Sequence, residues 1–550
     1  MRKNSGILSG AMALFAANAA VKLMGMIYKI PLQRILTDAG MGYFSAAYNV
    51  YAWFYVLSTA GLPVAVSVCV ARARAEKRYG LCGRIYRVSL FAFSVVGAVF
   101  SALMLLFCRR FASLASLDGA YLCIAAISPC VLFSCVSASV RGYYQGHGIM
   151  WVTAVSQLIE ATGKLVFGLI FAGLATAAGY GICTASACAV AGITCGSLLS
   201  AVLCVIIKCF YLRPPRQTEC RTPVLVPVLK TALPVALSAS VMNLTALTDV
   251  FMFPALLGSA GYTQIKAAEI YGNYTTVCTS LINLPSAFIT PVCASVLPAL
   301  TAAVAEGREE RIRSLQRFLY GAAFLIGAPC AAGLFALSYP VPALIFTESS
   351  AALSAPMLAV MSPAVVLIAV LSASDTVLQS SGKAFRTLIG MSAGALLRVL
   401  FAVLLFRFTG LDVLCMPVAA CACYLCAAVF NLIFARCRGV NVAALAIKPL
   451  ICAVLCGVTA EAAYSALHVR VSDGVSTVLA VACGAIIYLL SVYASGYLRD
   501  AGIYETLSIK KERTNDSIRQ KREVRLGRSA KDNADSALSR RLSVGYRADA

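Results

Sequence analysis

The chain has little charge for its length. Asp, Glu, Lys and Arg make up 13% of its 550 residues, compared with about 25% in soluble domains, which excludes an ordinary water-soluble fold. Histidine is rarer still, because the only two, His147 and His468, are far apart in sequence. The densest cysteine group, Cys421, Cys423 and Cys426, lies in an apolar run with no histidine nearby. We therefore expect no metal site and no cofactor.

Apolar residues fill the chain almost from end to end. Hydrophobic residues make up 60% of the sequence, and the mean hydropathy is +0.83. Apolar runs of about 20 residues recur without an alternating strand pattern, and each is long enough to cross a bilayer core as a helix. The sequence therefore predicts an all-α integral membrane protein with about fourteen transmembrane helices. Their expected centres lie near Ala17, Tyr55, Val96, Pro129, Leu165, Cys195, Met242, Leu284, Leu325, Val365, Leu400, Cys423, Leu455 and Ile486.

The charges that are present are mostly positive. The formal net charge is +23, but the basic residues lie in short loops between apolar runs, which indicates membrane topology rather than nucleic-acid binding. The amino terminus and alternate loops together carry about 23 Lys and Arg, whereas the intervening loops carry about 6. Because cytoplasmic loops hold the excess of Lys and Arg, we expect both termini in the cytoplasm.

The composition changes after Arg499. Residues 499–550 are basic and Ser-rich and have little to bury, so we expect a disordered cytoplasmic tail. Its positive charges either reinforce the topology and attract anionic lipid headgroups or serve a specific binding function, and the pattern favours the first interpretation.

Part of the sequence is repeated. Ser128-Pro129, Arg141, Gln145, Gly148 and Lys164 reappear about 234 positions later as Ser362-Pro363, Asp375, Gln379, Gly382 and Arg398. The repeat predicts two six-helix lobes, an arrangement typical of transporters whose substrate site lies between the repeats. We expect an N-terminal lobe over 1–212, a cytoplasmic linker over 213–229, a C-terminal lobe over 230–438 and two further helices over 439–498.

The first helix has a polar face. Asn18, Lys22, Gly25 and Lys29 are spaced so that they share one side of a helix. Charges inside a membrane are costly, so each needs a partner, a watery cavity or a function. For Lys22 the depth favours a cavity, whereas Lys29 fits equally well a cavity or a side chain that reaches the outer interface.

Other charged residues fall inside predicted spans. Glu160 and Lys164 are four residues apart in the order that favours an ion pair, and this pair is compatible with a structural role or with a cavity lining. Arg398 is the repeat counterpart of Lys164. Asp249 and Asp375 are the remaining acids, and Asp375 is a candidate to balance Arg398.

The balance of these charges indicates the kind of ligand. Four candidate cavity cations, Lys22, Lys29, Lys164 and Arg398, outnumber the candidate acids, which predicts a mildly cationic cavity suited to a phosphate or pyrophosphate. The neutral Asn18 and the acids Glu160, Asp249 and Asp375 are the candidates for polar lining or ion coupling.

Several segments resemble a known family. The runs 22–31, 40–49 and 61–67, followed by 140–147 and 153–160, are similar to the stage V sporulation protein B-type proteins. Residues 271–274 with 283–285 resemble the start of the second half of those proteins. The resemblance covers about the first 500 residues and places the chain near the polysaccharide-transporter branch of the multidrug/oligosaccharidyl-lipid/polysaccharide flippase superfamily, which includes the MurJ-type lipid II flippases.

The resemblance implies a fold and a function. It implies a two-lobed bundle of fourteen helices in the bacterial cell membrane that moves undecaprenyl-pyrophosphate-linked sugars from the inner to the outer leaflet. It places Lys22 and Lys29 near basic positions that face the cavity in relatives. It also assigns Arg141, Gln145 and Gly146 to a loop motif, which we interpret as a gate or structural element. Proteins of cell-wall or polysaccharide synthesis are possible partners.

Three other functions are alternatives to a flippase. A drug or cation antiporter of the same superfamily would depend on Asp249 or Glu160. A membrane enzyme would need a loop-borne acidic cluster or a metal motif, and neither is present in the sequence, so we expect no enzymatic activity. A scaffold for cell-wall synthesis that transports nothing is compatible with the sequence.

Overall fold

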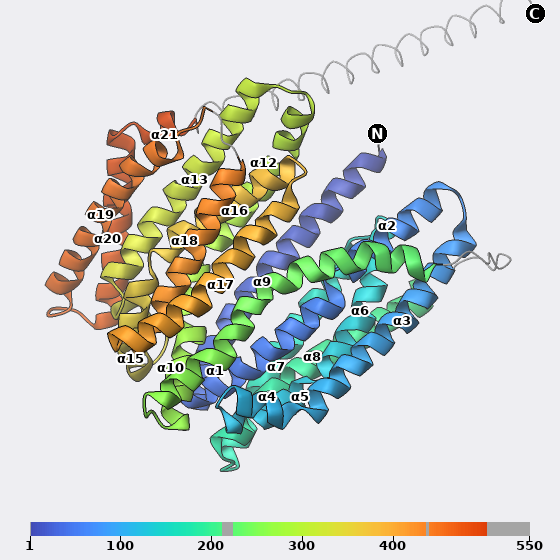
Figure 1. The fold of residues 1–550 in the computed structure, drawn as a ribbon, viewed down its shortest axis with the longest axis horizontal. Coiled ribbons are helices and arrows are strands. Elements are labelled where there is room, and N and C mark those ends of the chain that lie inside the picture. Colours follow the sequence, from blue (N-terminus) through green and yellow to red (C-terminus); the bar gives the residue numbers. More distant parts are fainter. Residues whose placement is uncertain (1, 212–223, 436–438, 503–550) are drawn as a thin grey trace, which may run out of the picture.

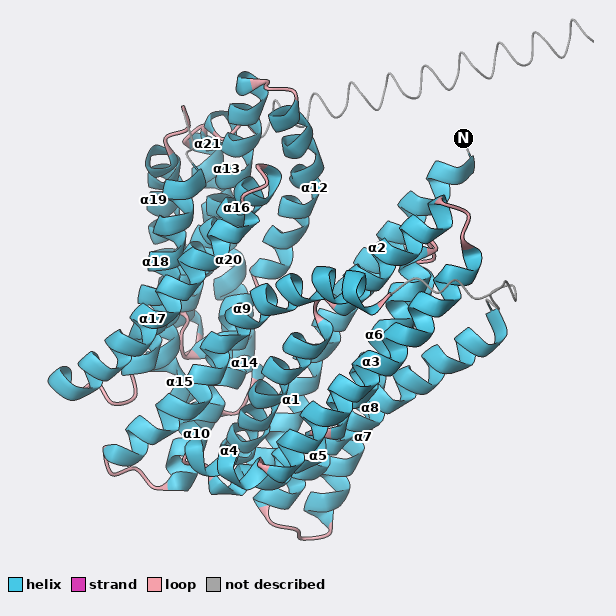
Figure 2. Ribbon diagram, turned by 45° about the vertical axis from the view of Figure 1, so that its right-hand side comes forward, coloured by secondary structure: helices cyan, strands magenta, loops and turns pink. Residues whose placement is uncertain are grey.

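A computed structural model describes residues 2–211, 224–435 and 439–502. Within these ranges every regular element is a helix (Figures 1 and 2), so the expected all-α class is confirmed. Helices suit this sequence because they satisfy every backbone hydrogen bond internally, which a lipid environment requires. Much of the expected linker and nearly all of the expected tail lie outside the described residues.

The helices follow one another with short connections. The first group comprises α1 (Arg2–Thr59), α2 (Leu62–Ala75), α3 (Tyr79–Leu106), α4 (Cys108–Leu114), the 3₁₀ turn η1 (Asp118–Ala120), α5 (Tyr121–Ile127), α6 (Pro129–Gly146), α7 (Trp151–Ala177) and α8 (Ile182–Tyr211). A long helix, α9 (Leu225–Ser259), comes next. We refer to α1–α8 as the N-terminal lobe.

The second group completes the bundle. It comprises α10 (Gln264–Asn273), the π-helical turn η2 (Tyr274–Cys278), α11 (Thr279–Asn283), α12 (Ser286–Ala305), α13 (Glu309–Ala336), α14 (Pro340–Ile345), α15 (Glu348–Met361), α16 (Ala364–Ser380), α17 (Ala384–Thr409) and α18 (Cys415–Ala435). We refer to α10–α18 as the C-terminal lobe. Beyond it, α19 (Val442–Leu467) and α20 (Asp473–Ala494) lie at its edge, where α19 packs on α13, and α21 (Tyr497–Asp500) ends the described chain.

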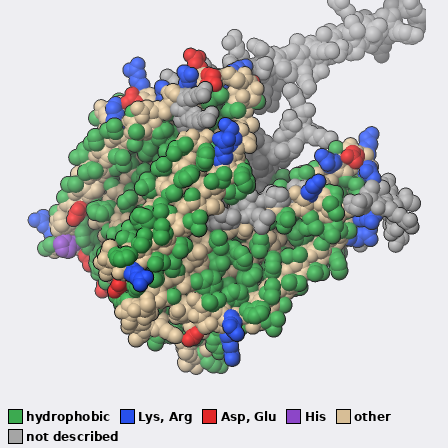
Figure 3. All heavy atoms as spheres, viewed as in Figure 1, with side chains coloured by type: hydrophobic (Ala, Val, Ile, Leu, Met, Phe, Trp, Pro, Cys, Tyr) green, Lys and Arg blue, Asp and Glu red, His purple; other side chains and the backbone are tan. Residues whose placement is uncertain are grey.

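Among the described residues, eleven helical segments are long and apolar enough to cross a membrane. The number rises to twelve when the bent pair α15–α16 counts as one span. The chain is thus a multi-pass membrane protein, but the expected count of fourteen is not confirmed. Hydrophobic side chains cover the broad face seen in Figure 3, and most Lys and Arg lie at its margins, as expected for helices in contact with lipid.

The longest helix, α1, is two helices joined at a break. Thr37 has φ 62° and ψ 176°, which no helix accommodates, so the axis changes direction there. The break separates the two spans that the sequence predicts around Ala17 and Tyr55. In Figure 1, α1 runs from the end marked N toward the opposite end of the molecule, where α5 and α10 are labelled.

At that opposite end the two lobes are in direct contact. Gln33 Nε2 donates hydrogen bonds of 2.8 Å both to Asp38 Oδ1 and to Ser350 Oγ of α15. Ser350 Oγ also donates to Asp38 Oδ1 at 2.5 Å. All three side chains are buried, so this set joins α1 to the C-terminal lobe. We call Gln33, Asp38 and Ser350 the interlobe latch.

The backbones of the two lobes also approach closely near the latch. A Cβ on Gly42 of α1 would lie 2.1 Å from the carbonyl oxygen of Ala268 in α10, and one on Gly272 would lie 2.4 Å from that of Asp38. Only glycine permits such a contact. Toward the end that carries the start of α1 and α21, the ribbons of α2–α3 and α12–α13 diverge instead (Figures 1 and 2).

The long helix α9 contacts both lobes. Near its start, Val228 and Ala232 pack in a cluster with Leu62 and Val66 of α2. Near its end, Phe253 joins the main core that α1 and α10 share. The expected start of the second lobe at residue 230 therefore falls inside a helix that crosses from one lobe to the other.

Replacing Gly42 with Ala should destabilise the protein, because overlap with the Ala268 carbonyl in a packed interface costs about 1–3 kcal/mol. The matched control is Gly173→Ala in α7, where an added Cβ meets nothing within 4 Å and the better helix propensity of Ala is worth up to about 1 kcal/mol. Thermal unfolding in detergent should show a lower Tm for the first variant and an unchanged or higher Tm for the second. Equal Tm values for both variants would contradict the close contact.

Candidate functional cavity

The N-terminal lobe contains a cavity of about 390 Å³. It lies between α1, α6, α7 and α8, and its wall combines aromatic rings with charged and amide side chains. The lining residues are Val21, Met24, Gly25, Tyr28, Tyr48, Tyr51, Ala52, Tyr55, Arg141, Gln157, Glu160, Ala161, Lys164 and Ile193. Its size is at the lower end of the ~300–1,000 Å³ typical of ligand pockets.

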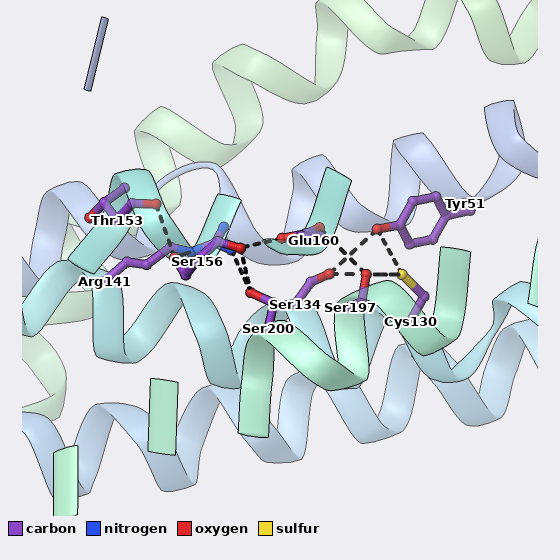
Figure 4. Close-up of polar contacts among 9 residues, drawn as sticks. All are labelled: Tyr51, Cys130, Ser134, Arg141, Thr153, Ser156, Glu160, Ser197 and Ser200. Atoms are coloured by element: carbon purple, nitrogen blue, oxygen red, sulfur yellow. Dashed lines mark hydrogen bonds and ion pairs between the residues drawn. The ribbon is translucent and has the colours of Figure 1, made fainter. Parts of the chain in front are cut away.

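A partly buried ion pair forms one wall of this cavity (Figure 4). The guanidinium of Arg141 in α6 donates to Glu160 Oε2 in α7 at 2.7 Å, and to the hydroxyls of Ser156 at 2.8 Å and Ser200 at 2.9 Å. Ser197 Oγ donates to the second carboxylate oxygen of Glu160 at 3.4 Å. Each charge therefore has several partners, as a buried ion pair requires.

This pairing corrects two expectations. The spacing of Glu160 and Lys164 predicts an ion pair between them, but Glu160 binds Arg141, because α6 crosses α7 at the level of the carboxylate. The resemblance assigns Arg141 to a loop, yet it lies inside helix α6 with only 7% of its surface exposed. The count of about 23 Lys and Arg in the amino terminus and alternate loops included Arg141, which lies in a helix instead.

The other two residues of that motif have structural contacts at the end of α6. Gln145 Nε2 donates to Thr153 Oγ1 at 3.1 Å across the α6–α7 turn. Gly146 packs against α2, where a Cβ would lie 2.7 Å from the Cβ of Val70. Neither residue lines the cavity, so the expected gate role stays a prediction.

Lys164 faces the cavity without a carboxylate partner among the described residues. Its Nζ lies 4.7 Å from the ring centroid of Tyr48 and 5.4 Å from that of Tyr28, both on α1. Cation–π contacts of this kind hold an ammonium group in place but leave its hydrogen-bond donors available. Lys164 is therefore a positioned and unneutralised cation.

The polar face of the first helix is only partly described. Lys29 Nζ donates to Ser280 Oγ of α11 at 2.9 Å, which ties α1 to the C-terminal lobe. It has no carboxylate partner within the described ranges, and it follows Tyr28, whose ring contacts Lys164. Asn18 is exposed. The side chain of Lys22 lies outside the described residues.

In the C-terminal lobe, Arg398 is neutralised. Its Nη2 donates to Asp249 Oδ2 of α9 at 2.6 Å and also to the Tyr274 hydroxyl. All three side chains are buried. The expectation that Asp375 balances Arg398 is therefore wrong. Arg398 is thus paired with an acid from α9, unlike Lys164, and its expected role as a cavity cation stays a prediction.

Asp375 has a different environment. Asn431 Nδ2 of α18 donates to its Oδ1 at 2.6 Å, and no Lys or Arg lies within ion-pair distance among the described residues. In the same described ranges, no three His, Cys, Asp or Glu side chains come together as they would around a metal ion.

Comparison with protein families identifies the family to which the chain belongs. A model described as polysaccharide biosynthesis protein matches residues 7–304, more than half of the chain. The chain belongs to this family. The match covers the N-terminal lobe, with its cavity, as well as α9 to α11.

Two curated relatives of this chain come from Bacillus subtilis (strain 168). Stage V sporulation protein B is 28% identical over 313 residues, which are 55% of this chain and 59% of that protein. Lipid II flippase MurJ is 22% identical over 442 residues, which are 74% of this chain and 79% of that protein. The chain thus spans about three fifths of the first relative and about four fifths of the second.

Solved structures share the fold. A structure of the lipid II flippase MurJ in an inward closed conformation superposes with a TM-score of 0.65 at 14% identity, over 88% of this chain and 99% of that one. An inward-facing multidrug resistance MATE family transporter of the MOP superfamily gives 0.61 at 18% identity, over 78% and 98%. At these identities the likeness shows that the all-α fold is shared and shows nothing finer.

Sequence reasoning missed the tyrosines of the cavity. Tyr48, Tyr51 and Tyr55 are spaced by three and four residues, which places them on one helix face. That spacing was a usable signal for an aromatic wall. The serines that hold Arg141 gave no comparable signal, because Ser is common in membrane helices and its partner comes from another helix.

Replacing Asp249 with Asn should strongly destabilise this family member, because removing one partner of a buried ion pair costs about 3–5 kcal/mol and the Asp249–Arg398 side chains are only 9% and 5% exposed. The control is Glu269→Gln, which breaks the exposed pair with Lys266 and should cost at most about 1 kcal/mol. Denaturant unfolding in detergent measures both. Similar losses of stability would contradict the assigned pairing.

Proposed function

We propose that this protein is a flippase that carries undecaprenyl-pyrophosphate-linked sugars from the inner to the outer leaflet of the bacterial cell membrane. The observation that carries the proposal is Lys164, an ammonium group held over Tyr28 and Tyr48 and directed at a cavity without a carboxylate partner among the described residues. A phosphate oxygen is the natural partner for such a group.

The charges of the cavity favour an anionic ligand. Arg141 and Glu160 neutralise each other, so Lys164 leaves the lining residues with a net positive charge. Lys29 adds a second cation on the same wall helix, α1. An antiporter for lipophilic cations would need a free carboxylate in the cavity, whereas Glu160, the acid among the lining residues, is paired with Arg141.

The arrangement of the lobes supports alternating access. The interlobe latch and the Gly42–Ala268 contact close the end opposite the start of α1. A pyrophosphate sugar would enter between the lobes from the other end, while the prenyl chain stays in lipid. Rocking of the lobes would then break the latch and release the headgroup outward. No covalent step is needed.

The orientation of the protein in the membrane is part of the same proposal. The start of α1 and the last described helix, α21, lie at the same end of the bundle (Figure 1). We place that end in the cytoplasm because alternate loops carry the excess of Lys and Arg. Those loops and the basic tail would attract anionic lipids, and proteins of cell-wall synthesis are candidate partners.

Replacing Lys164 with Gln should slow flipping strongly, because it removes the cation but keeps a side chain of similar length. The measurement is protein-dependent flipping of a labelled undecaprenyl-pyrophosphate sugar in liposomes. We expect a rate at least about tenfold below wild type, equal to about 1.4 kcal/mol, with Lys164→Arg retaining activity. Lys266→Gln, at an exposed lysine of α10, is the matched control and should flip normally.

Two results would count against the proposal. Folded wild-type protein that flips no sugar-bearing pyrophosphate lipid would leave a cation antiporter or a scaffold that transports nothing as the better functions. Flipping that survives in Lys164→Gln would move the pyrophosphate site away from this cavity.

A further inference from the structure

Aromatic rings form a continuous row along the cavity wall. Phe44, Tyr48, Tyr51 and Tyr55 follow one another on α1, with neighbouring ring centroids 6.4, 6.0 and 5.6 Å apart. The three tyrosines line the cavity. A row of this length exceeds what is needed to position Lys164, which contacts only Tyr48 and Tyr28.

The members of this wall differ in how firmly they are held. The Tyr51 hydroxyl accepts a hydrogen bond from Cys130 Sγ at 3.1 Å and lies 3.4 Å from Ser134 Oγ (Figure 4). The Tyr28 hydroxyl donates to the Ala189 carbonyl at 3.3 Å. These rings are 5% and 1% exposed, whereas Tyr48 is 36% exposed. The Tyr48 hydroxyl has no hydrogen-bond partner among the described residues.

Planar polar groups complete the cavity. The carboxylate of Glu160 and the amide of Gln157 lie one turn apart on α7, and both line it together with Arg141. Gln157 Oε1 is buried without a hydrogen-bond partner among the described residues, which is costly unless a ligand or water supplies a donor. The cavity thus combines a partly exposed aromatic ring, that of Tyr48, with hydrogen-bond acceptors and donors held on helices.

We propose that this cavity is the subsite for the first sugar of the lipid-linked substrate, with Tyr48 as its stacking platform and Glu160 and Gln157 as its hydroxyl partners. The inference rests on the proposed function and deepens it. The C–H groups of a pyranose ring pack on an aromatic face, while its hydroxyls need planar hydrogen-bonding groups at the rim. Both kinds of group are present here.

The position of Lys164 links the sugar to the phosphate. Its Nζ lies 4.7 Å from the Tyr48 ring centroid, so a phosphate bound to that ammonium group lies beside the ring. In a sugar pyrophosphate the pyranose is bonded directly to a phosphate oxygen. With the phosphate at Lys164, the sugar ring would therefore lie next to Tyr48 with no spacer between them. A prenyl chain would gain nothing from Glu160 or Arg141, and Lys164 would repel a lipophilic cation.

The test compares binding of two lipids to the purified full-length protein in detergent. The probes are undecaprenyl pyrophosphate carrying one N-acetylhexosamine and undecaprenyl pyrophosphate without a sugar. We expect wild type to bind the sugar-bearing lipid about tenfold more tightly, a preference that stacking and hydroxyl contacts together can supply. Microscale thermophoresis gives both Kd values, and their ratio is the readout.

Three variants locate the preference. Tyr48→Leu keeps an apolar side chain but removes the flat ring, so the ratio should fall to about one. Tyr48→Phe keeps the ring and should retain most of the preference. Tyr180→Ala, at a tyrosine that is 62% exposed outside the cavity, is the matched control. Thermal unfolding shows whether each variant is folded. Because Leu and Phe are both large apolar residues, the Tyr48→Leu and Tyr48→Phe variants differ mainly in the flat ring and can be compared with each other.

The outcomes separate this inference from the proposed function. A wild-type ratio near one, or a ratio that persists in folded Tyr48→Leu, overturns the sugar subsite while lipid binding through Lys164 still stands. Folded wild type that binds neither lipid overturns the proposed function and the subsite together. A preference lost in Tyr48→Leu and kept in Tyr48→Phe supports the subsite.

Discussion

Inside a bundle that faces lipid, a charged side chain is stable only when opposite charge, hydrogen bonds or water offset the loss of hydration. Arg141 meets this condition through Glu160 and the hydroxyls of Ser156 and Ser200, and Ser197 donates to Glu160. Arg398 meets it through Asp249 and Tyr274. Lys164 meets it only in part, through two aromatic rings. The cavity keeps its positive charge because the neighbouring carboxylate, Glu160, is already paired with Arg141.

The two repeats solve this problem differently. In the N-terminal lobe the pair lies within the repeated segment, between α6 and α7. About 234 positions later, Asp375 stands where the first repeat has Arg141, and Gly394 stands where it has Glu160. Arg398 therefore takes its counter-charge from outside the segment, from α9. The Arg398–Asp249 pair joins α17 to α9. The cavity with an unneutralised cation is in the N-terminal lobe.

The sequence was sufficient for features that depend on composition and period. Apolar runs predicted the helical class, and the resemblance of several segments to known proteins indicated the family. It was insufficient where a partner comes from a distant helix. Glu160 is four residues from Lys164 but binds Arg141, and Arg398 binds Asp249, which is 149 residues away. Sequence spacing indicates an ion-pair partner on the same helix, whereas the partner actually bound depends on which charged side chains the packing of other helices brings close.

Helix α1 connects the features that matter for transport. Before the break at Thr37 it carries Tyr28 and Lys29, which face the cavity cation and the C-terminal lobe. At the break Asp38 belongs to the interlobe latch. After the break the same helix returns with Tyr48 in the cavity wall.

The cavity wall and the contact that closes the far end therefore lie on one continuous chain segment. That segment changes direction at Thr37, next to the latch. The latch joins α1 to α15 through hydrogen bonds among three buried side chains. The proposed transport cycle would break these hydrogen bonds, so it would act on the same segment that carries the cavity wall.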